Sequence, residues 1–146
     1  QAYSLENVTC LNLACLDRPG QLQVETLPVW ESNYVREGPP SPTSFPVEAI
    51  PFDALCRRHA IDRIDYLKMN IEGAERTALP GCREALKRTR FCTIAAHDFR
   101  ADRGEGEHFR TRGFVWDFLS DLGFTLTTRD DDPRYYVPYH IHAHRP

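Results

Sequence analysis

The segment "RIDYLKMNIEGAE" at residues 63–75 constrains the possible folds of this chain more than any other part of it. Its apolar residues predict a strand from about Ile64, and alternate side chains of a strand lie on the same face. Gly73 permits a sharp exit into a helix, whose first turn then holds Glu75. One face of the strand carries a mostly polar row of side chains: Tyr66, Lys68, Asn70 and Glu72. Polar groups therefore gather at the carboxyl end of the strand, where α/β sheets bind ligands.

A second segment, "FCTIAAHDF" at residues 91–99, is apolar until its last residues, which include His97. Its composition predicts a strand that is buried on both faces. If the two strands are neighbours, Asn70, Glu72 and His97 lie around one crevice. Such a set suits general-base catalysis, because histidine titrates near neutral pH and a carboxylate can orient its ring. Two alternatives stay open: His97 can be a structural, hydrogen-bonded histidine, and Lys68 can belong to a structural ion pair.

The rest of the chain alternates between predicted strands and helices. Strands are expected at residues 7–16, 20–29, 124–129 and 135–145, a strand followed by a helix at residues 47–61, and helices at residues 74–79, 82–90 and 108–123. The prolines of residues 31–46 predict an irregular loop, either a substrate-facing flap or a surface excursion. This order predicts a single domain over residues 1–146 with an α/β layered sheet, mostly parallel and closed by antiparallel strands.

The composition is that of a globular protein, with 41% apolar and 27% charged residues. The formal net charge of -3 and the lack of a long basic stripe argue against nucleic acid as a partner. No apolar run approaches the ~18 residues that a membrane span needs, so no membrane partner is expected. The five cysteines show no C-x-x-C spacing and lie mostly in apolar segments, which predicts reduced, buried thiols and a cytoplasmic protein.

The strand motif also carries a family resemblance. The segment "IDYLKMNIEGAE", Ile64 to Glu75, resembles the pattern "hDhhKhDhEGhE" of FkbM-type methyltransferases, in which h is an apolar residue. Two further segments are similar to later segments of the family's sequence: "LPGCREAL" at residues 79–86 and "FVWDFLSDLGFTLTTRDDD" at residues 114–132. The resemblance implies a Rossmann-like class I methyltransferase sheet that transfers a methyl group from S-adenosylmethionine, commonly to a hydroxyl of a sugar or small natural product.

The same resemblance assigns strands to that sheet. It makes residues 64–71 the fourth strand and residues 91–97 the fifth, with residues 124–129 and 135–144 as the closing antiparallel pair. The glycine-rich cofactor turn and the acidic strand end of the family are not found in this sequence, and the resemblance places them upstream of Gln1. The chain is therefore expected to be the C-terminal portion of the fold, with the N-terminal part missing, exposed sheet faces and a tendency to form homo-oligomers.

The resemblance also implies roles for individual residues. The end of the fourth strand faces the transferred methyl group in this family, so Asn70 and Glu72 are active-site candidates. Asn70 stands where the family more often has Asp, and an amide cannot act as a base. His97 or Glu72 is therefore expected to take the proton of the acceptor, while Asn70 and Lys68 are candidates for contacts with the cofactor. The further substrate-binding candidates are Glu75 and Asp98.

Two other functions stay open. A domain that keeps this fold without a cofactor site would be a non-catalytic relic or a binding module. A metal-binding module would use His140, His142 and His144, which share one face of the last strand. At a rise of ~3.3 Å per residue their spacing is about 6.5–7 Å, which is too wide to surround one ion, so no metal site is expected.

Overall fold

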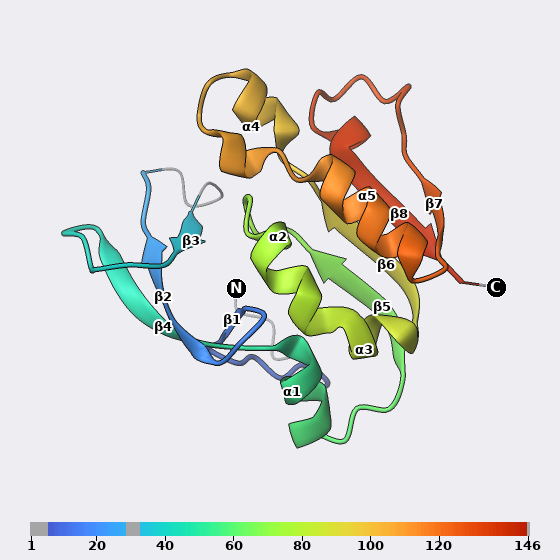
Figure 1. Ribbon diagram of the computed structural model, residues 1–146, viewed down its shortest axis with the longest axis horizontal. Helices are drawn as coiled ribbons and strands as arrows, with labels where there is room; N and C mark the ends of the chain where they lie inside the picture. The colour runs from blue at the N-terminus through green and yellow to red at the C-terminus, as the bar shows by residue number, and fades with distance from the viewer. Residues whose placement is uncertain (1–5, 29–32, 146) are drawn as a thin grey trace.

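The structure is a computed structural model that describes residues 6–28 and 33–145. In this part of the chain the strands form two four-stranded sheets, in the orders β1-β4-β2-β3 and β5-β6-β8-β7 (Figure 1). The strands of the first sheet are β1 (Ala14–Cys15), β2 (Gly20–Glu25), β3 (Tyr34–Arg36) and β4 (Ser44–Ile50). The strands of the second sheet are β5 (Ile64–Met69), β6 (Thr89–Ala95), β7 (Thr125–Thr127) and β8 (His140–His144).

The second sheet brings together the two strands that the sequence singled out. β5 pairs in parallel with β6, and β8 lies antiparallel between β6 and β7. The predicted neighbours are therefore confirmed. The closing antiparallel pair is also present, but its strands are shorter than the predicted ranges 124–129 and 135–144, because a 3-10 turn at Val137–Tyr139 precedes β8. Because β5 and β6 run in the same direction, their carboxyl ends meet at one edge of the sheet.

The expectation of one, mostly parallel sheet is wrong for the described residues. Only β1–β4 and β5–β6 pair in parallel there, whereas β2 pairs antiparallel with both β3 and β4. Residues 31–46 were expected to form an irregular loop, but β3 and the start of β4 lie in this range. Pairing with β2 supplies the backbone hydrogen bonds of these segments, which a local reading of their prolines does not reveal.

The first predicted strand is also much shorter than expected. Of residues 7–16, only Ala14 and Cys15 are in a strand, and residues 7–12 are exposed. β1 pairs with β4 at Ala49 and Ile50 alone, so the residues before it have no partner strand in the described part of the chain. An apolar pattern without a pairing partner does not make a strand. The predicted strand at residues 20–29 ends at Glu25, and residue 29 lies outside the described residues.

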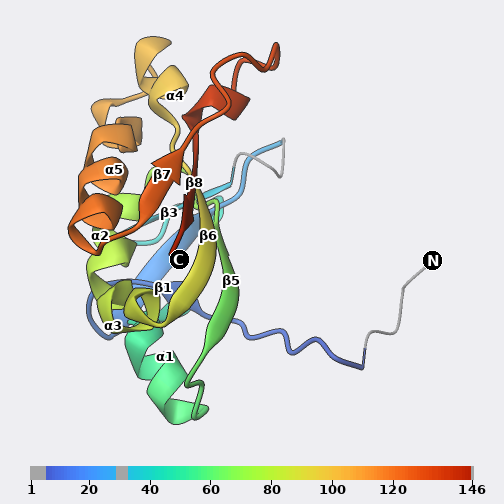
Figure 2. The ribbon, with the colours of Figure 1, turned by 90° about the vertical axis from the view of Figure 1, so that its right-hand side faces the viewer.

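Helices connect the strands and cover one face of the second sheet. They are α1 (Phe52–Arg58), α2 (Glu75–Ala78), α3 (Arg83–Lys87), α4 (Asp98–Asp102) and α5 (Arg112–Asp121), with 3-10 turns at Leu79–Cys82, Glu107–Phe109 and Val137–Tyr139. α2, α3 and α5 lie on the same face of this sheet, and within the described residues no helix covers the other face (Figure 2). None of the helices in the described ranges is long and apolar enough to cross a membrane.

The main core lies between the second sheet and these helices. Leu67 and Met69 on β5 point into it, which confirms the alternation predicted for this strand. The largest apolar side chains that are completely buried here are Leu79, Leu86, Ile94, Leu119 and Ile141. A smaller cluster under the first sheet consists of Leu16, Leu22, Val47 and Ala49. The second sheet therefore has the larger core, which lies beneath the strands β5 and β6.

The other face of the second sheet is open to solvent. Tyr66 on β5 and Phe91 on β6 are register partners on this face, and they are 57% and 41% exposed. The expectation of an exposed sheet face is thus confirmed, whereas the expectation that the strand at residues 91–99 is buried on both faces is wrong at Phe91. Two aromatic rings in contact with water on neighbouring strands leave apolar surface unburied, which favours association.

Asp53 shows how distant segments stabilise one another in this packing. It lies in the first turn of α1, and its carboxylate accepts hydrogen bonds from the backbone N–H groups of Glu84 and Ala85 at 3.0 and 2.7 Å. These N–H groups belong to the first turn of α3, where a helix has no internal acceptor for them. Asp53 therefore caps α3 from the neighbouring helix.

We expect Asp53→Ala to lower the free energy of unfolding by about 1–3 kcal/mol, because two N–H groups lose their acceptor. Urea denaturation measures this change. Asp62→Ala, at an exposed position between α1 and β5, is the matched control and should change the free energy of unfolding by less than about 0.5 kcal/mol. Equal effects of the two substitutions would contradict the capping role.

Candidate active site

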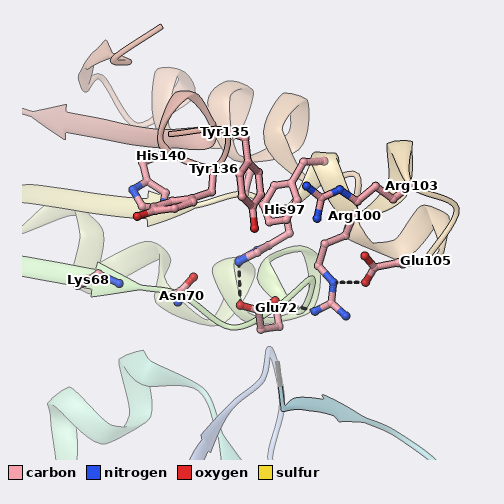
Figure 3. A pocket seen from close by; sticks show the side chains of 12 residues that line it. Lys68, Asn70, Glu72, His97, Arg100, Arg103, Glu105, Tyr135, Tyr136 and His140 are labelled. Carbon is pink, nitrogen blue, oxygen red and sulfur yellow. Dashed lines mark hydrogen bonds and ion pairs between the residues drawn. The ribbon is translucent and has the colours of Figure 1, made fainter. Parts of the chain in front are cut away.

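A cavity of about 370 Å³ lies where the carboxyl ends of β5 and β6 meet (Figure 3). The β5 side contributes Lys68, Asn70 and Glu72. The segment after β6 contributes His97, Phe99, Arg100, Arg103 and Glu105, and the segment that leads into β8 contributes Tyr135, Tyr136 and His140. The volume falls in the range of about 300–1,000 Å³ that is typical of small-molecule sites.

The backbone after β5 turns sharply to bring Glu72 into the cavity. Glu72 has a φ of 52° and Gly73 a φ of 95°, so two consecutive residues adopt the left-handed region. A residue with a Cβ atom costs roughly 1–2 kcal/mol in this region and stays there only where other contacts hold it. At Gly73 a Cβ atom would lie 3.0 Å from Cδ1 of Phe109, so glycine also fits the space that is available.

Two cationic side chains hold Glu72 in place. Its Oε1 atom lies 3.0 Å from Nε2 of His97, and its Oε2 atom accepts a hydrogen bond of 2.7 Å from Nη1 of Arg100. Arg100 also donates through Nε to Glu105 at 2.6 Å. The side chains of Glu72, His97 and Arg100 are largely buried, and charge-assisted hydrogen bonds are stronger than neutral ones. This network offsets the unfavourable backbone conformation of Glu72.

A second carboxylate lies on the buried side of His97. Glu75, in the first turn of α2, is completely buried, and its Oε1 atom is 3.5 Å from Nδ1 of His97. Among the described residues neither oxygen of this carboxylate has a partner within ordinary hydrogen-bond geometry. His97 is therefore held between Glu72, which lines the cavity, and Glu75, which does not.

The two carboxylates decide the charge of His97. Burial by itself lowers the pKa of His97, but Glu72 and Glu75 outweigh burial and raise the pKa to about 9. Burial acts to raise the pKa of Glu72, but His97 and Arg100 keep this pKa below its usual value. At neutral pH the pair is an imidazolium and a carboxylate, so His97 has no free lone pair with which to accept a proton.

Lys68 and Asn70 keep free polar groups at the cavity. Both side chains are exposed, and neither forms a side-chain hydrogen bond or ion pair with another residue of the described ranges. The structural ion pair considered for Lys68 is therefore not formed there. Burial, and to a smaller extent the charge of Lys68, lowers the pKa of His140, which leaves this imidazole neutral at pH 7.

The two predicted substrate-binding carboxylates lie outside the cavity lining. Asp98 begins α4, and its Oδ2 atom accepts hydrogen bonds from the backbone N–H groups of Thr111 and Arg112, both at 2.9 Å. It therefore caps the first turn of α5. Glu75 lies behind His97, as described above. The structure thus brings Lys68, Asn70, Glu72 and His97 together and gives the other two candidates structural contacts.

Sequence reasoning missed the residues that complete the cavity. Arg100, Arg103 and Glu105 come from "FRADRGEGE" at residues 99–107, and the density of charge directly after a predicted strand was the available signal. Tyr135 and Tyr136 reach the cavity because β8 lies next to β6. No local pattern in the sequence specifies that pairing.

The histidines of β8 do not form a metal site. Within the described residues there is no group of three or more His, Cys, Asp or Glu side chains that could hold a metal ion. The ring centroids of His140 and His142 are 6.5 Å apart, and Nδ1 of His142 lies 3.1 Å from Oγ1 of Thr93.

The five cysteines are free thiols, and three of them are buried: Cys56, Cys82 and Cys92.

Comparison with known proteins places most of this chain in a family. The family described as Methyltransferase FkbM domain matches residues 22–126. The chain belongs to this family, as the motif at residues 64–75 indicated, and the membership indicates methyl transfer as its general activity. The matched range includes Asn70, Glu72 and His97. Neither the curated proteins nor the solved structures gave a significant match.

We expect the ion pairs of His97 to stabilise the fold fully below about pH 6.5 and to weaken as the pH rises through about 9. The sign follows because the folded pKa lies above the unfolded value, so folding binds a proton between these two values. The contribution that is lost should be on the order of 2–3 kcal/mol. Urea unfolding at pH values of about 6, 8 and 9.5 measures it.

His97→Gln should lose this part of the pH dependence. His59→Gln, which changes an exposed histidine after α1, is the matched control and should keep the wild-type slope. If the free energy of unfolding varied with pH equally in both variants, the buried imidazolium would be the wrong assignment.

Proposed function

We propose that this domain transfers a methyl group from S-adenosylmethionine to a hydroxyl of a sugar or another small molecule, in the cavity at the ends of β5 and β6. The observation that carries the proposal is that the FkbM motif residues Asn70 and Glu72 line the same cavity as His97. The cofactor would supply the activated methyl group.

We also propose that residues 1–146 form one domain whose second sheet is part of a Rossmann-like fold.

The free polar groups of the cavity fit the amino-acid end of this cofactor. Lys68 offers an ammonium group to a carboxylate, and the amide of Asn70 offers both a donor and an acceptor. Neither group has to break a contact within the described residues before it binds a ligand. These residues provide no glycine-rich turn between a strand and a helix, so the fit concerns this end of the cofactor only.

In this proposal Glu72 takes the proton of the acceptor hydroxyl. Each of its oxygens keeps a further acceptor position beyond the contact with His97 or Arg100. These contacts stabilise the carboxylate and make it a weak base. A weak base is sufficient here. When the alcohol oxygen bonds to the methyl group it becomes a positively charged oxonium, which is a strong acid and gives up its proton easily.

His97 and Arg100 are positioning residues in this proposal. Each holds one oxygen of Glu72, so the carboxylate keeps one orientation at the cavity. Holding a reacting group in the right geometry is one of the larger sources of enzymatic acceleration. The protonated state of His97 suits this role, because an imidazolium donates to Glu72 and does not compete with it for the proton.

We expect the protein to bind S-adenosylmethionine and Lys68→Met and Asn70→Ala to weaken binding about tenfold or more, because hydrogen bonds to charged groups contribute roughly 1.5–3 kcal/mol. Isothermal titration calorimetry measures the dissociation constants. Lys87→Met and Asn7→Ala change exposed side chains that do not line the cavity and serve as matched controls. A wild-type protein that binds no cofactor at millimolar concentration would contradict the proposal and favour a binding module with this fold.

We expect Glu72→Gln to lower kcat for methyl transfer about 10²–10⁴-fold, because the acceptor loses its base. Affinity for the cofactor should change by less than about threefold. Transfer of an isotope-labelled methyl group to a panel of hydroxyl compounds measures the rate. Glu84→Gln, on the exposed side of α3, is the matched control. A larger loss in His140→Gln than in Glu72→Gln would instead identify the neutral imidazole as the base.

A further inference from the structure

Arg103 differs from the other arginine of the cavity. Arg100 is paired with two glutamates, whereas no carboxylate within residues 6–28 and 33–145 lies at ion-pair distance from Arg103. The guanidinium carbon of Arg103 lies 4.6 Å from the ring centroid of Tyr135 and 5.4 Å from that of Phe99. Stacking against aromatic rings orients a guanidinium and leaves its N–H edge free for a ligand.

The cavity also carries an excess of positive charge. The charged side chains of its lining are the cations Lys68, His97, Arg100 and Arg103 and the anions Glu72 and Glu105. Glu72 and Glu105 are paired with His97 and Arg100, and the buried Glu75 lies behind His97, so among the described residues the lining cations without a carboxylate partner are Lys68 and Arg103. Unpaired cations in a partly shielded cavity attract an anionic ligand.

The two unpaired cations are well separated. Lys68 and Arg103 lie at opposite ends of the cavity, with Glu72 and His97 between them (Figure 3). A ligand held at Lys68 and another held at Arg103 would therefore meet beside Glu72. Under the proposed function Lys68 belongs to the cofactor, which leaves Arg103 for the acceptor.

Aromatic rings continue from Arg103 along the wall of the cavity. Phe99 and Tyr135 meet edge to face with their centroids 5.3 Å apart, and Tyr135 and Tyr136 do so at 5.4 Å. Tyr135 and Tyr136 are 58% and 39% exposed, so part of each ring is open to a ligand. A ligand ring that packs on this wall places its substituents within reach of the guanidinium.

We propose that the acceptor is a ring compound that carries a carboxylate or phosphate group, that Arg103 binds this group, and that Tyr135 packs against the ring. A guanidinium suits both groups because its parallel N–H bonds match two of their oxygens. The role of this compound as methyl acceptor rests on the proposed function, whereas its binding does not. An aromatic carboxylate and a sugar phosphate share this chemistry, and the experiment separates them.

NMR titrations of the protein without cofactor test the proposal. The probes are two matched pairs, 4-hydroxybenzoate with 4-hydroxybenzamide and glucose 6-phosphate with glucose. In at least one pair the anionic probe should bind about tenfold or more tightly than its neutral partner, because it gains a charge-assisted contact. The pair that shows the preference identifies the kind of ring.

Arg103→Gln should abolish this preference, whereas Arg90→Gln should leave it within about twofold. Arg90 is the matched control, because its guanidinium also stacks on an aromatic ring, that of Phe91 at 4.9 Å, but does not line the cavity. Tyr135→Leu should weaken both members of the preferred pair, and an unchanged affinity would overturn the ring contact.

The proposal is overturned if neither anionic probe is preferred, or if the preference survives Arg103→Gln. Neither result depends on methyl transfer, since no cofactor is present in the titration. A protein that binds the anionic probe through Arg103 but does not bind S-adenosylmethionine would keep this inference and contradict the proposed function.

Discussion

The contact of Glu72 with His97 and Arg100 is the interaction on which the rest of the site depends. It holds a residue in a left-handed conformation and joins the segment after β5 to the segment after β6. Because His97 also contacts the buried Glu75 in α2, the same imidazole connects the cavity to the helix layer. Loss of Glu72 would leave His97 with Glu75 and Arg100 with Glu105, whereas loss of His97 would leave the buried carboxylate of Glu75 without a cation, which is strongly destabilising.

Carboxylates from distant segments also determine where two helices begin. Asp53 caps α3 from α1, and Asp98 caps α5 from the first turn of α4. The second of these contacts matters for the site. The segment with Arg100 and Arg103 directly follows Asp98, so its start is fixed both by this cap and by the neighbouring ion pair of His97. The position of Arg100 and Arg103 in the cavity is therefore linked to the contact between Asp98 and α5.

Much of the candidate site could be predicted from the sequence, because its central residues follow two apolar strands. Lys68, Asn70, Glu72 and His97 all line the cavity. The protonation state of His97 could not be predicted, since it depends on Glu75, which was expected to bind substrate from a first helical turn but is completely buried. Asp98 was expected to bind substrate, but it caps α5 instead. The sequence does not reveal this, because the backbone N–H groups that it accepts from belong to Thr111 and Arg112, far along the chain.

The sequence by itself determined β5 and β6, the polar ends of both strands and the family to which the chain belongs. Alternation along a strand and the residue that ends it are local properties, so a single segment encodes them. Only the tertiary structure decided that the strands divide into two sheets, that β8 lies between β6 and β7, and that Arg103 meets Tyr135. The physical reason is that strand pairing and burial are shared between segments far apart in the chain, and no local pattern specifies which partner a segment will find.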